Sequence, residues 1–214
     1  MDVDLDWLAQ IEPGLQQYHD LLADDGVRRG LIGPREAPRL WDRHLRNCAA
    51  VADPHTELVP EQARIADIGS GAGLPGLVWA LARPDCSVTL VEPLQRRTSF
   101  LSEVVTELGL DDRVLVLRGR AQDLPPLGVD VATSRALAPL SQVLRWSFPH
   151  LRPGGVLLAM KGSRASRELS EARETIDDVG GQAPEVVRIG PEDSSGHPLA
   201  IVVRVRKAAR TASR

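Results

Sequence analysis

The sequence predicts an α/β protein, in which a mainly parallel sheet follows a helical N-terminal segment and ends in an antiparallel hairpin. Two observations predict this fold class. From about Ala63 onward, short β-branched runs alternate with helical stretches, a pattern that is typical of parallel sheets built from βαβ units. The last two runs are separated by a polar loop without a helix, so these two strands should pair antiparallel.

The helical part comes first. Residues 1–60 carry apolar residues at helical spacing and are expected to form helices, which Pro13 and Gly26 should interrupt. Residues 61–207 are expected to form the sheet domain, with the helical segment packed on it. Residues 208–214 are expected to be a disordered basic tail. A chain of 214 residues suits one large domain with such an accessory segment.

Seven segments have the composition of strands. In chain order they are RIADIG (64–69), SVTLVE (87–92), RVLVLRG (113–119), VDVATS (129–134), GVLLAMKG (155–162), APEVVRIG (183–190) and LAIVVRVRK (199–207). The first five are each followed by a helical pattern and should lie parallel. In open sheets of this kind, ligands bind beyond the carboxyl ends of the strands, so functional residues are sought there.

The composition excludes several classes of protein. An apolar fraction of 43% is enough for a core, while no apolar run approaches the roughly 20 residues that a membrane helix needs. The start, MDVDLDWLAQ, has no basic residue and does not fit a signal peptide. Cys48 and Cys86 stand far apart, and His44 and His197 lack ligand spacing, so we expect neither a disulfide framework nor a metal site. We expect a monomer in the cytoplasm, without membrane contact.

A glycine-rich segment, ADIGSGAGLPGL, begins in the first predicted strand. Its spacing fits two cofactors. Gly71-x-Gly73-x-x-Gly76 fits the fingerprint that binds the pyrophosphate of a dinucleotide. Asp67-x-Gly69-x-Gly71-x-Gly73 fits the loop that many methyltransferases wrap around S-adenosylmethionine. The loop alone leaves both cofactors open.

The end of the second predicted strand also suits both cofactors. Glu92 stands there, and a carboxylate at this place can accept from both hydroxyls of a ribose. Three features favour the methyl donor. We expect no second domain to hold a hydride acceptor, and a terminal antiparallel hairpin is typical of the seven-stranded methyltransferase sheet. The third strand ends in RGRAQDL, where Ala121, Gln122 or Asp123 can meet the adenine amino group.

Several segments together resemble one protein family. They are RLWDRHL (39–45), DIGSGAGLPGL (67–77), VEPLQRRTSFLSEVVTELGL (91–110), RGRAQDL (118–124), TSRALAPL (133–140) and MKG (160–162). In this order they resemble the bacterial RsmG/GidB family, which methylates guanine N7 of 16S ribosomal RNA. The resemblance implies a class I S-adenosylmethionine-dependent methyltransferase, with a Rossmann-like, seven-stranded sheet.

The resemblance also implies a set of cofactor residues. Gly69 and Leu74 would line the methyl-donor pocket, together with the loop glycines Gly71 and Gly73. Ala121 and Gln122 would hold the adenine, and Arg135 would lie at the open end. The family usually has Glu where this chain has Gln122. Because glutamine keeps a carbonyl acceptor but lacks the charge, a backbone contact is the safer expectation at that position.

The reaction can be tested against the residues themselves. Methylation of a pyrimidine carbon needs a cysteine nucleophile, but neither cysteine follows a catalytic strand. Exocyclic amines are usually methylated by an Asn/Asp-Pro-Pro-aromatic motif after the fourth strand, where this chain has Thr133-Ser134-Arg135-Ala136. Guanine N7 has a free lone pair and loses no proton when it is methylated. The enzyme therefore needs no general base and has only to position the guanine and the methyl group. Arg135 can then contact guanine O6 or a phosphate.

The segment GPREAPRLWDRHLRNCAAV is predicted to bind RNA. On a regular helix, Arg35, Arg39, Arg43 and Arg46 share one stripe, while Trp41, Leu45 and Cys48 lie roughly opposite and should dock on the sheet domain. A solvated charged face is the alternative for this arginine stripe. Lys161, one of two lysines, follows the fifth strand and is a candidate phosphate contact or an ordinary exposed lysine.

The sequence therefore predicts a guanine-N7 methyltransferase whose partner is 16S rRNA, the small ribosomal subunit or an assembly intermediate, and whose cofactor is S-adenosyl-L-methionine. Three alternatives stay open. A methyltransferase for a small metabolite would bind the donor without RNA affinity. An NAD-linked oxidoreductase would change nicotinamide absorbance on turnover. A non-catalytic RNA-binding module would leave the glycine loop without a purpose.

Overall fold

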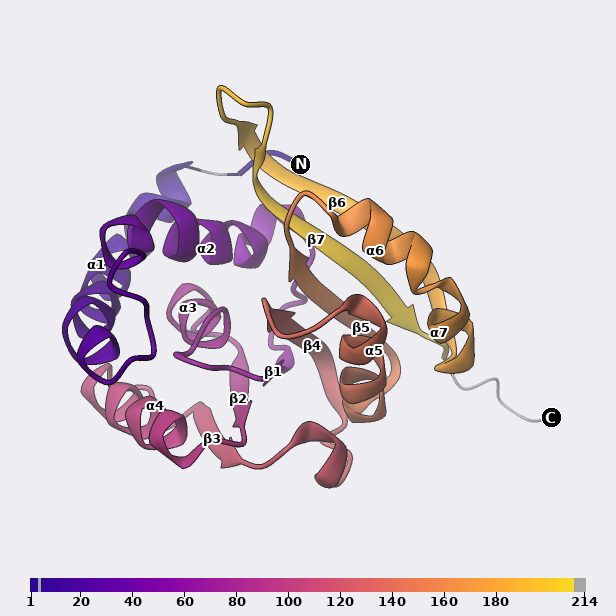
Figure 1. Ribbon diagram of the computed structural model, residues 1–214, viewed down its shortest axis with the longest axis horizontal. Coiled ribbons are helices and arrows are strands. Elements are labelled where there is room, and N and C mark those ends of the chain that lie inside the picture. Colours follow the sequence, from indigo (N-terminus) through magenta and orange to yellow (C-terminus); the bar gives the residue numbers. More distant parts are fainter. Residues whose placement is uncertain (4, 210–214) are drawn as a thin grey trace.

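Figure 1 shows a twisted sheet with helices on both faces, in a computed structural model that describes residues 1–3 and 5–209. The strands are β1 (Arg64–Ile68), β2 (Ser87–Glu92), β3 (Val114–Arg118), β4 (Val129–Arg135), β5 (Leu151–Lys161), β6 (Gly181–Glu192) and β7 (Pro198–Lys207). Their order in the 7-stranded sheet is β3-β2-β1-β4-β5-β7-β6. β1 to β5 pair in parallel, and β7 lies antiparallel to both β5 and β6. The predicted fold class is confirmed, including the terminal hairpin.

The helices divide into two groups (Figure 1). One face of the sheet carries α1 (Leu5–Leu21), α2 (Arg46–Ala52), α3 (Gly76–Ala82) and α4 (Gln95–Glu107), and the other carries α5 (Leu140–Ser147), α6 (Ala165–Glu171) and α7 (Arg173–Asp178). Each face has its own core. In the first, Tyr18 of α1 and Trp79 of α3 are fully buried together with apolar side chains of the sheet. The N-terminal helices therefore share one core with the strands that carry the glycine-rich segment.

Helix α1 differs from the prediction at Pro13. The sequence predicts a break there, but α1 continues through this residue. Leu8, Leu15 and Tyr18 are buried on one side of the helix, and this packing outweighs the local preference of proline. Pro13 and Ala9 are both exposed, so water can replace the helical donor that the Ala9 carbonyl loses at Pro13. The prediction of a break at Pro13 was wrong for this reason.

The arginine-rich segment is not one regular helix. It forms a 3₁₀ helix at Ala37–Arg39 and a π-helix at Leu40–Leu45 before α2 begins. The constant 100° per residue that defined the predicted stripe therefore does not apply, because these helices wind more tightly and more loosely than an α-helix. Leu45 and Cys48 are nevertheless buried, and Arg39 and Arg43 are exposed. The docked apolar side is thus as expected, although the helix type is different.

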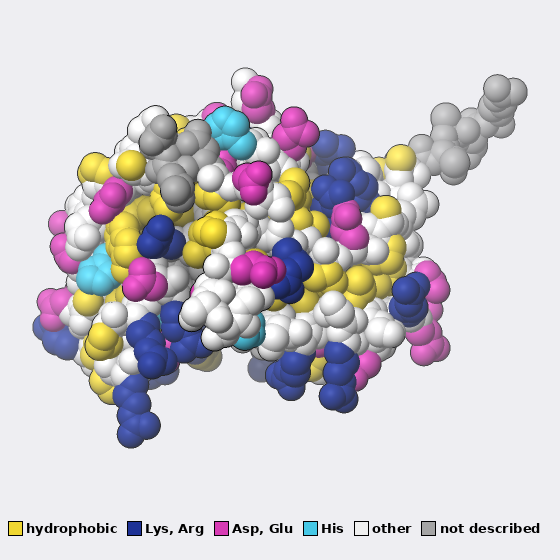
Figure 2. Space-filling view, turned by 90° about the horizontal axis from the view of Figure 1, so that it is seen from above, with side chains coloured by type: hydrophobic (Ala, Val, Ile, Leu, Met, Phe, Trp, Pro, Cys, Tyr) yellow, Lys and Arg dark blue, Asp and Glu magenta, His cyan; other side chains and the backbone are white. Residues whose placement is uncertain are grey.

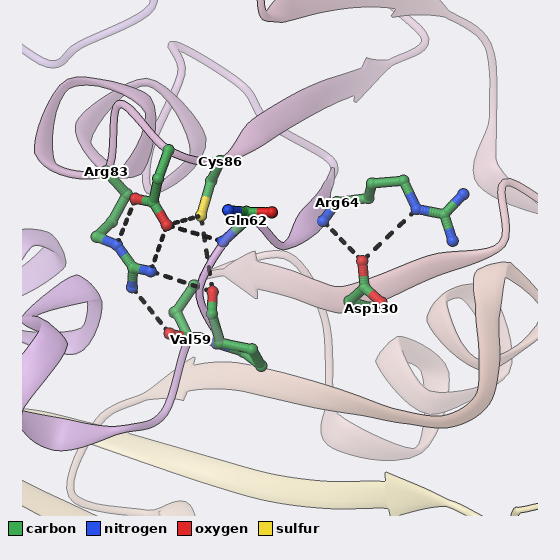
Figure 3. Close-up of polar contacts among 8 residues, drawn as sticks. Val59, Gln62, Arg64, Arg83, Cys86 and Asp130 are labelled. Carbon is green, nitrogen blue, oxygen red and sulfur yellow. Dashed lines mark hydrogen bonds and ion pairs between the residues drawn. The ribbon is translucent and has the colours of Figure 1, made fainter.

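Polar contacts fix the amino-terminal ends of the strands (Figure 3). The Arg83 guanidinium is buried and donates to the carbonyl of Val59 at 2.8 Å and to both carboxylate oxygens of Asp85 at 2.8 Å. Its hydrogen bonds hold the pKa of Asp85 well below the usual range. The Arg64 amide donates to Asp130 at 2.8 Å, which ties β1 to β4. Hydrogen bonds and ion pairs thus join the strands at their amino-terminal edge. This edge lies opposite the one that holds the candidate site.

Met1 and Ala208 contact the chain near the hairpin of the last two strands. The Met1 amino group donates to the carbonyl of Arg188 at 3.0 Å, beside β6. At the other end, the amide of Ala208 donates to Gly180 at 3.0 Å, and residues 210–214 of the predicted tail lie outside the described part of the chain. Within the described residues, every helix is too short or too polar to cross a membrane.

Candidate functional site

The glycine loop (69–75) joins β1 to α3 where the strand order reverses, at the carboxyl edge of the sheet. The amide of Gly69 donates to Val91 of β2 at 2.8 Å, which anchors the loop. Gly69, Gly71 and Gly73 have φ angles of 74°, 60° and 107°, which residues with side chains rarely adopt. The backbone path of the loop therefore requires glycine at these three positions.

The space beside these glycines differs from one to the next. A Cβ on Gly71 would meet nothing closer than the carbonyl of Gly69, at 3.9 Å. A Cβ on Gly69 would collide with the side chain of Leu137, which follows β4. A Cβ on Gly73 would lie 2.7 Å from the hydroxyl of Tyr18. Gly71 is thus where the loop faces open space. At Gly69 and Gly73, side chains of the protein occupy the space that a Cβ would need.

Glu92 ends β2 beside the loop and is 1% exposed. Its Oε2 accepts from the amide of Gly71 at 3.0 Å, and its Oε1 accepts from the amide of Leu94 at 3.0 Å. Arg97 lies 3.4 Å from Oε2 and offers a compensating charge. A carboxylate has about four lone-pair positions, so these partners leave it able to accept from a ligand hydroxyl.

Asp67 lies beneath the loop, at the end of β1, and is fully buried. Its Oδ2 accepts from the amide of Gly76 at 3.0 Å, while its Oδ1 has no hydrogen-bond partner among the described residues. Burial raises the pKa of Asp67 to about 7, against the opposing effect of the Gly76 hydrogen bond. The donor side of the site therefore contains a buried carboxyl group that titrates near neutrality.

The predicted adenine residues lie in a short 3₁₀ helix after β3. Ala121 is buried, and its carbonyl accepts from Nε2 of His150 at 2.9 Å. Gln122 is exposed. Leu74, in the glycine loop, is partly buried against the first core. This turn lies at the same carboxyl edge of the sheet as the glycine loop, and its contact with adenine stays a prediction.

Arg135 ends β4 and reaches the N-terminal segment. Its Nη2 donates to the carbonyl of Arg43 at 3.0 Å and to Nδ1 of His44, and its Nη1 lies 3.7 Å from Sγ of Cys48. Because Nδ1 accepts, the His44 proton is on Nε2, which donates to Glu36 at 3.0 Å. Burial and the Arg135 charge lower the pKa of His44, which keeps the ring neutral. The sequence predicts Arg135 at the open end of the pocket but does not reveal these internal partners.

Lys161 ends β5, next to Arg135 in the sheet. Its Nζ donates to the carbonyl of Ala138 at 2.7 Å and to Glu168 at 2.8 Å, and its side chain is 8% exposed. The interpretation as an ordinary exposed lysine was wrong, because this ion pair covers the ammonium group. The phosphate contact stays a prediction, and it requires Lys161 to leave Glu168.

A groove of about 1340 Å³ opens at the ends of β4 and β5. Basic residues that line the groove are Arg43, Arg46, Arg135, Lys161, Arg164 and Arg167. Acidic residues also line it: Asp42, Glu168, Glu171, Glu192 and Asp193. In Figure 2, basic side chains gather along the lower edge of the face seen there, although the whole chain has a net charge of -3. Arg35 and Arg39 do not line the groove but are exposed on the segment that leads to it.

Two contacts with the loop were not predicted, those of Tyr18 and Leu137. Tyr18 is the chain's only tyrosine, and it lies on the apolar face of a predicted helix, where a core position is the ordinary interpretation. Leu137 follows the TSRA segment and has an apolar side chain, which gives no signal of a site residue. Within the described residues, no group of three or more His, Cys, Asp or Glu side chains could hold a metal ion.

Comparison with known proteins identifies the family. The model of the GidB family, described as rRNA small subunit methyltransferase G, matches residues 11–193. The chain belongs to this family. It is 53% identical over 194 residues to the ribosomal RNA small subunit methyltransferase G of Thermobifida fusca, covering 90% of this chain and 79% of the relative. The protein of the same description from Streptomyces coelicolor is 51% identical over 193 residues, covering 88% and 77%.

Solved structures agree in fold. A putative S-adenosyl-L-methionine-dependent methyltransferase from Methanococcus maripaludis aligns with a TM-score of 0.62 at 13% identity, covering 81% of this chain and 91% of that one. A SAM-dependent O-methyltransferase from Thermotoga maritima aligns with a TM-score of 0.60 at 18% identity, covering 78% and 67%. At such identities the likeness concerns the fold, which is that of class I methyltransferases. The cofactor of the family is S-adenosyl-L-methionine.

Proposed function

We propose that this chain transfers a methyl group from S-adenosylmethionine to N7 of a guanine in a decoding-region loop of 16S rRNA. The observation that carries the proposal is a juxtaposition at one edge of the sheet. The glycine loop with Glu92 lies beside β4, and the basic groove begins at Arg135 on the same strand. Membership of the family supports the assignment of small-subunit rRNA as the substrate.

The residues present fit the methyl donor. Gly71 offers open space beside a loop of constrained backbone, and the Glu92 carboxylate faces that loop. Glu92 would accept from a ribose hydroxyl, and the loop residues Gly69, Gly71, Gly73 and Leu74 would line the donor. The turn at Ala121 and Gln122 would hold the adenine, with a backbone contact expected there. When bound, the donor supplies a methyl group activated by its positively charged sulfur.

On the substrate side, the protein has to bind and orient the guanine. N7 attacks through its own lone pair and loses no proton, so the chain needs no general base. Arg135 would direct the base through its remaining N–H groups, because a guanidinium carries several and its internal partners occupy only some of them. The proposed phosphate contacts are Arg35, Arg39, Arg43, Arg46 and Lys161.

The setting of the reaction is also a proposal. The helical segment 1–60 would serve as the RNA-facing part, the sheet domain 61–207 would hold the donor, and residues 208–214 would be a tail. The chain would act in the cytoplasm as a monomer, without membrane contact. The substrate would be the rRNA itself, the small subunit or an assembly intermediate.

One experiment tests this proposal: N7-methylguanine is mapped in 16S rRNA from cells with and without the gene, and the gene is restored as wild type or Arg135→Ala. We expect one N7-methylguanine to disappear with the gene, to return with the wild type, and to return weakly with the variant. A map unchanged by the loss of the gene would refute the assignment. Donor affinity of Arg135→Ala is measured in parallel, since a defect confined to the donor would place Arg135 at the cofactor and not at the guanine.

A further inference from the structure

The N-terminal segment touches the glycine loop through one buried hydroxyl. Tyr18 of α1 is fully buried, and its Oη donates to the carbonyl of Ala72 at 2.7 Å. A Cβ added to Gly73 would lie only 2.7 Å from the same hydroxyl. A helix that begins at residue 5 therefore reaches into a loop that follows the first strand.

This hydrogen bond holds the Ala72 carbonyl, whereas the amides of Gly71 and Gly73 on either side form hydrogen bonds of their own. Ala72 lies between Gly71 and Gly73, both of which have positive φ and lack side chains that could pack. Glycine is the most conformationally free residue, so such a segment needs external contacts to hold one conformation. Burial raises the pKa of Tyr18 well above its ordinary value, so the phenol stays protonated and remains a donor.

We propose that Tyr18 is a positioning residue, which holds the glycine loop in the conformation that receives the methyl donor. The inference rests on the proposed function, since it assigns the loop to S-adenosylmethionine. The hydroxyl acts on the loop backbone and not on the donor. Its loss should therefore weaken donor binding by letting the loop sample other conformations, while the fold and the RNA groove stay in place.

A purely structural role for the hydroxyl predicts that any change in donor affinity follows the loss of stability. Another buried hydroxyl of the chain serves as a matched control. Thr56 is 1% exposed, and its hydroxyl donates to the carbonyl of Asp53 at 2.7 Å. It lies before β1, on the amino-terminal side of the strand, whereas the glycine loop follows the strand. Tyr18→Phe and Thr56→Val each delete one buried hydroxyl that donates to a backbone carbonyl, and each keeps the shape of the side chain.

The test measures the dissociation constant of S-adenosylmethionine for the full-length chain by calorimetry, with thermal unfolding of each variant. We expect Tyr18→Phe to raise that constant about 3- to 10-fold, the range for the removal of one hydrogen bond, and Thr56→Val to leave it unchanged. Equal constants for wild type and Tyr18→Phe overturn the proposal. Equal increases in both variants overturn it too, because the effect would then follow stability. A wild-type chain that binds no donor contradicts the proposed function itself.

A second measurement needs no substitution. Because the chain has a single tyrosine, incorporation of 3-fluorotyrosine labels Tyr18 alone. We expect its fluorine resonance in the folded chain to shift when S-adenosylmethionine is added, because the donor would bind against the loop that accepts its hydrogen bond. An unchanged resonance at saturating donor overturns the proposal, even if Tyr18→Phe fails to fold.

Discussion

The methyl-donor half of the site and its substrate half are built from different groups. On the donor side, backbone amides and buried carboxylates converge, as when Glu92 accepts from Gly71 and Asp67 accepts from Gly76. On the substrate side, long cationic side chains already have partners within the protein, as Arg135 has in His44 and Lys161 has in Glu168. The polar groups of the donor half are thus held in place by hydrogen bonds within the protein.

The cations of the substrate half have to exchange their internal partners for groups of the RNA. A phosphate or guanine that binds Arg135 or Lys161 replaces a neutral ring or a carboxylate, so breaking the internal hydrogen bond offsets part of the free energy gained on binding. The internal partners also keep the groove from carrying a large unbalanced charge. We infer that donor affinity depends on a few buried groups, whereas RNA affinity is spread over many cations, each of which contributes little.

The largest expected effect tests the donor half. Changing Glu92 to Ala should raise the dissociation constant of S-adenosylmethionine about 10- to 150-fold, which corresponds to about 1.5–3 kcal/mol for hydrogen bonds to a charged group. RNA affinity should not change. Calorimetry with the donor and with its demethylated product measures the effect. Glu168→Ala, which removes a carboxylate of the substrate half, is the matched control and should bind the donor as the wild type does. Unaltered donor affinity in Glu92→Ala would remove this residue from the ribose role.

The second prediction concerns Asp67 and the pH dependence of stability. Its pKa is about 7 in the folded chain and near 4 when unfolded, so the folded state retains a proton that the unfolded state releases. The stability that it contributes is fully present below about pH 4 and is lost as the pH rises through about 7. Between pH 5 and 7, the free energy of unfolding should fall by up to about 1.4 kcal/mol per pH unit relative to Asp67→Asn.

Urea unfolding from pH 5 to 8 measures that difference. The charged and titratable neighbours of Asp67 are present in both chains. Tyr18 and Cys48, whose pKa values burial raises, stay neutral in this range. His44 acts in the opposite direction, since its pKa is lowered and its contribution is lost as the pH falls, and it too is common to both chains. Parallel stability curves for wild type and variant would show that Asp67 does not titrate near neutrality.

The two halves also differ in how far the sequence predicts them. The donor half depends on neighbours along the chain, such as the loop glycines and the residue that ends β2, and its backbone path follows from the spacing of glycines. What the sequence does not predict there comes from a distant segment, since Tyr18 contacts Ala72 across 54 positions. The sequence identifies such a tyrosine as a core residue but does not show which backbone atom its hydroxyl meets.

On the substrate side, the sequence identifies the cations but not their partners. Arg135 and His44 are 91 positions apart, and only the packing of the N-terminal segment on β4 brings them together. The helix type of that segment was also missed, because π and 3₁₀ turns arise from tertiary packing and have no strong local signal. Periodicity predicted the buried side of the segment correctly, since burial depends on the apolar residues and tolerates local irregularity.

The smallest expected effect concerns the arginine stripe. Its guanidinium groups would displace condensed counterions from RNA phosphates, so binding must weaken with salt. Changing Arg39, Arg43 and Arg46 together to Gln keeps their length and removes three charges. The log–log slope of RNA affinity against salt should flatten by about 0.7–0.9 for each phosphate that the variant no longer neutralises. Donor affinity should be unchanged, because Glu92 and the glycine loop keep all their hydrogen bonds.

A matched control distinguishes specific phosphate contacts of the stripe from an effect of net charge on RNA binding. Arg28, Arg152 and Arg188 are also exposed and paired with carboxylates, at 67%, 49% and 52% side-chain exposure, and they do not line the groove. Their triple change to Gln alters the net charge by the same amount, so a nonspecific effect would flatten both slopes alike. A wild-type slope in the stripe variant would make these arginines a solvated face. The RNA platform would then lie around Lys161, Arg164 and Arg167, which line the same groove.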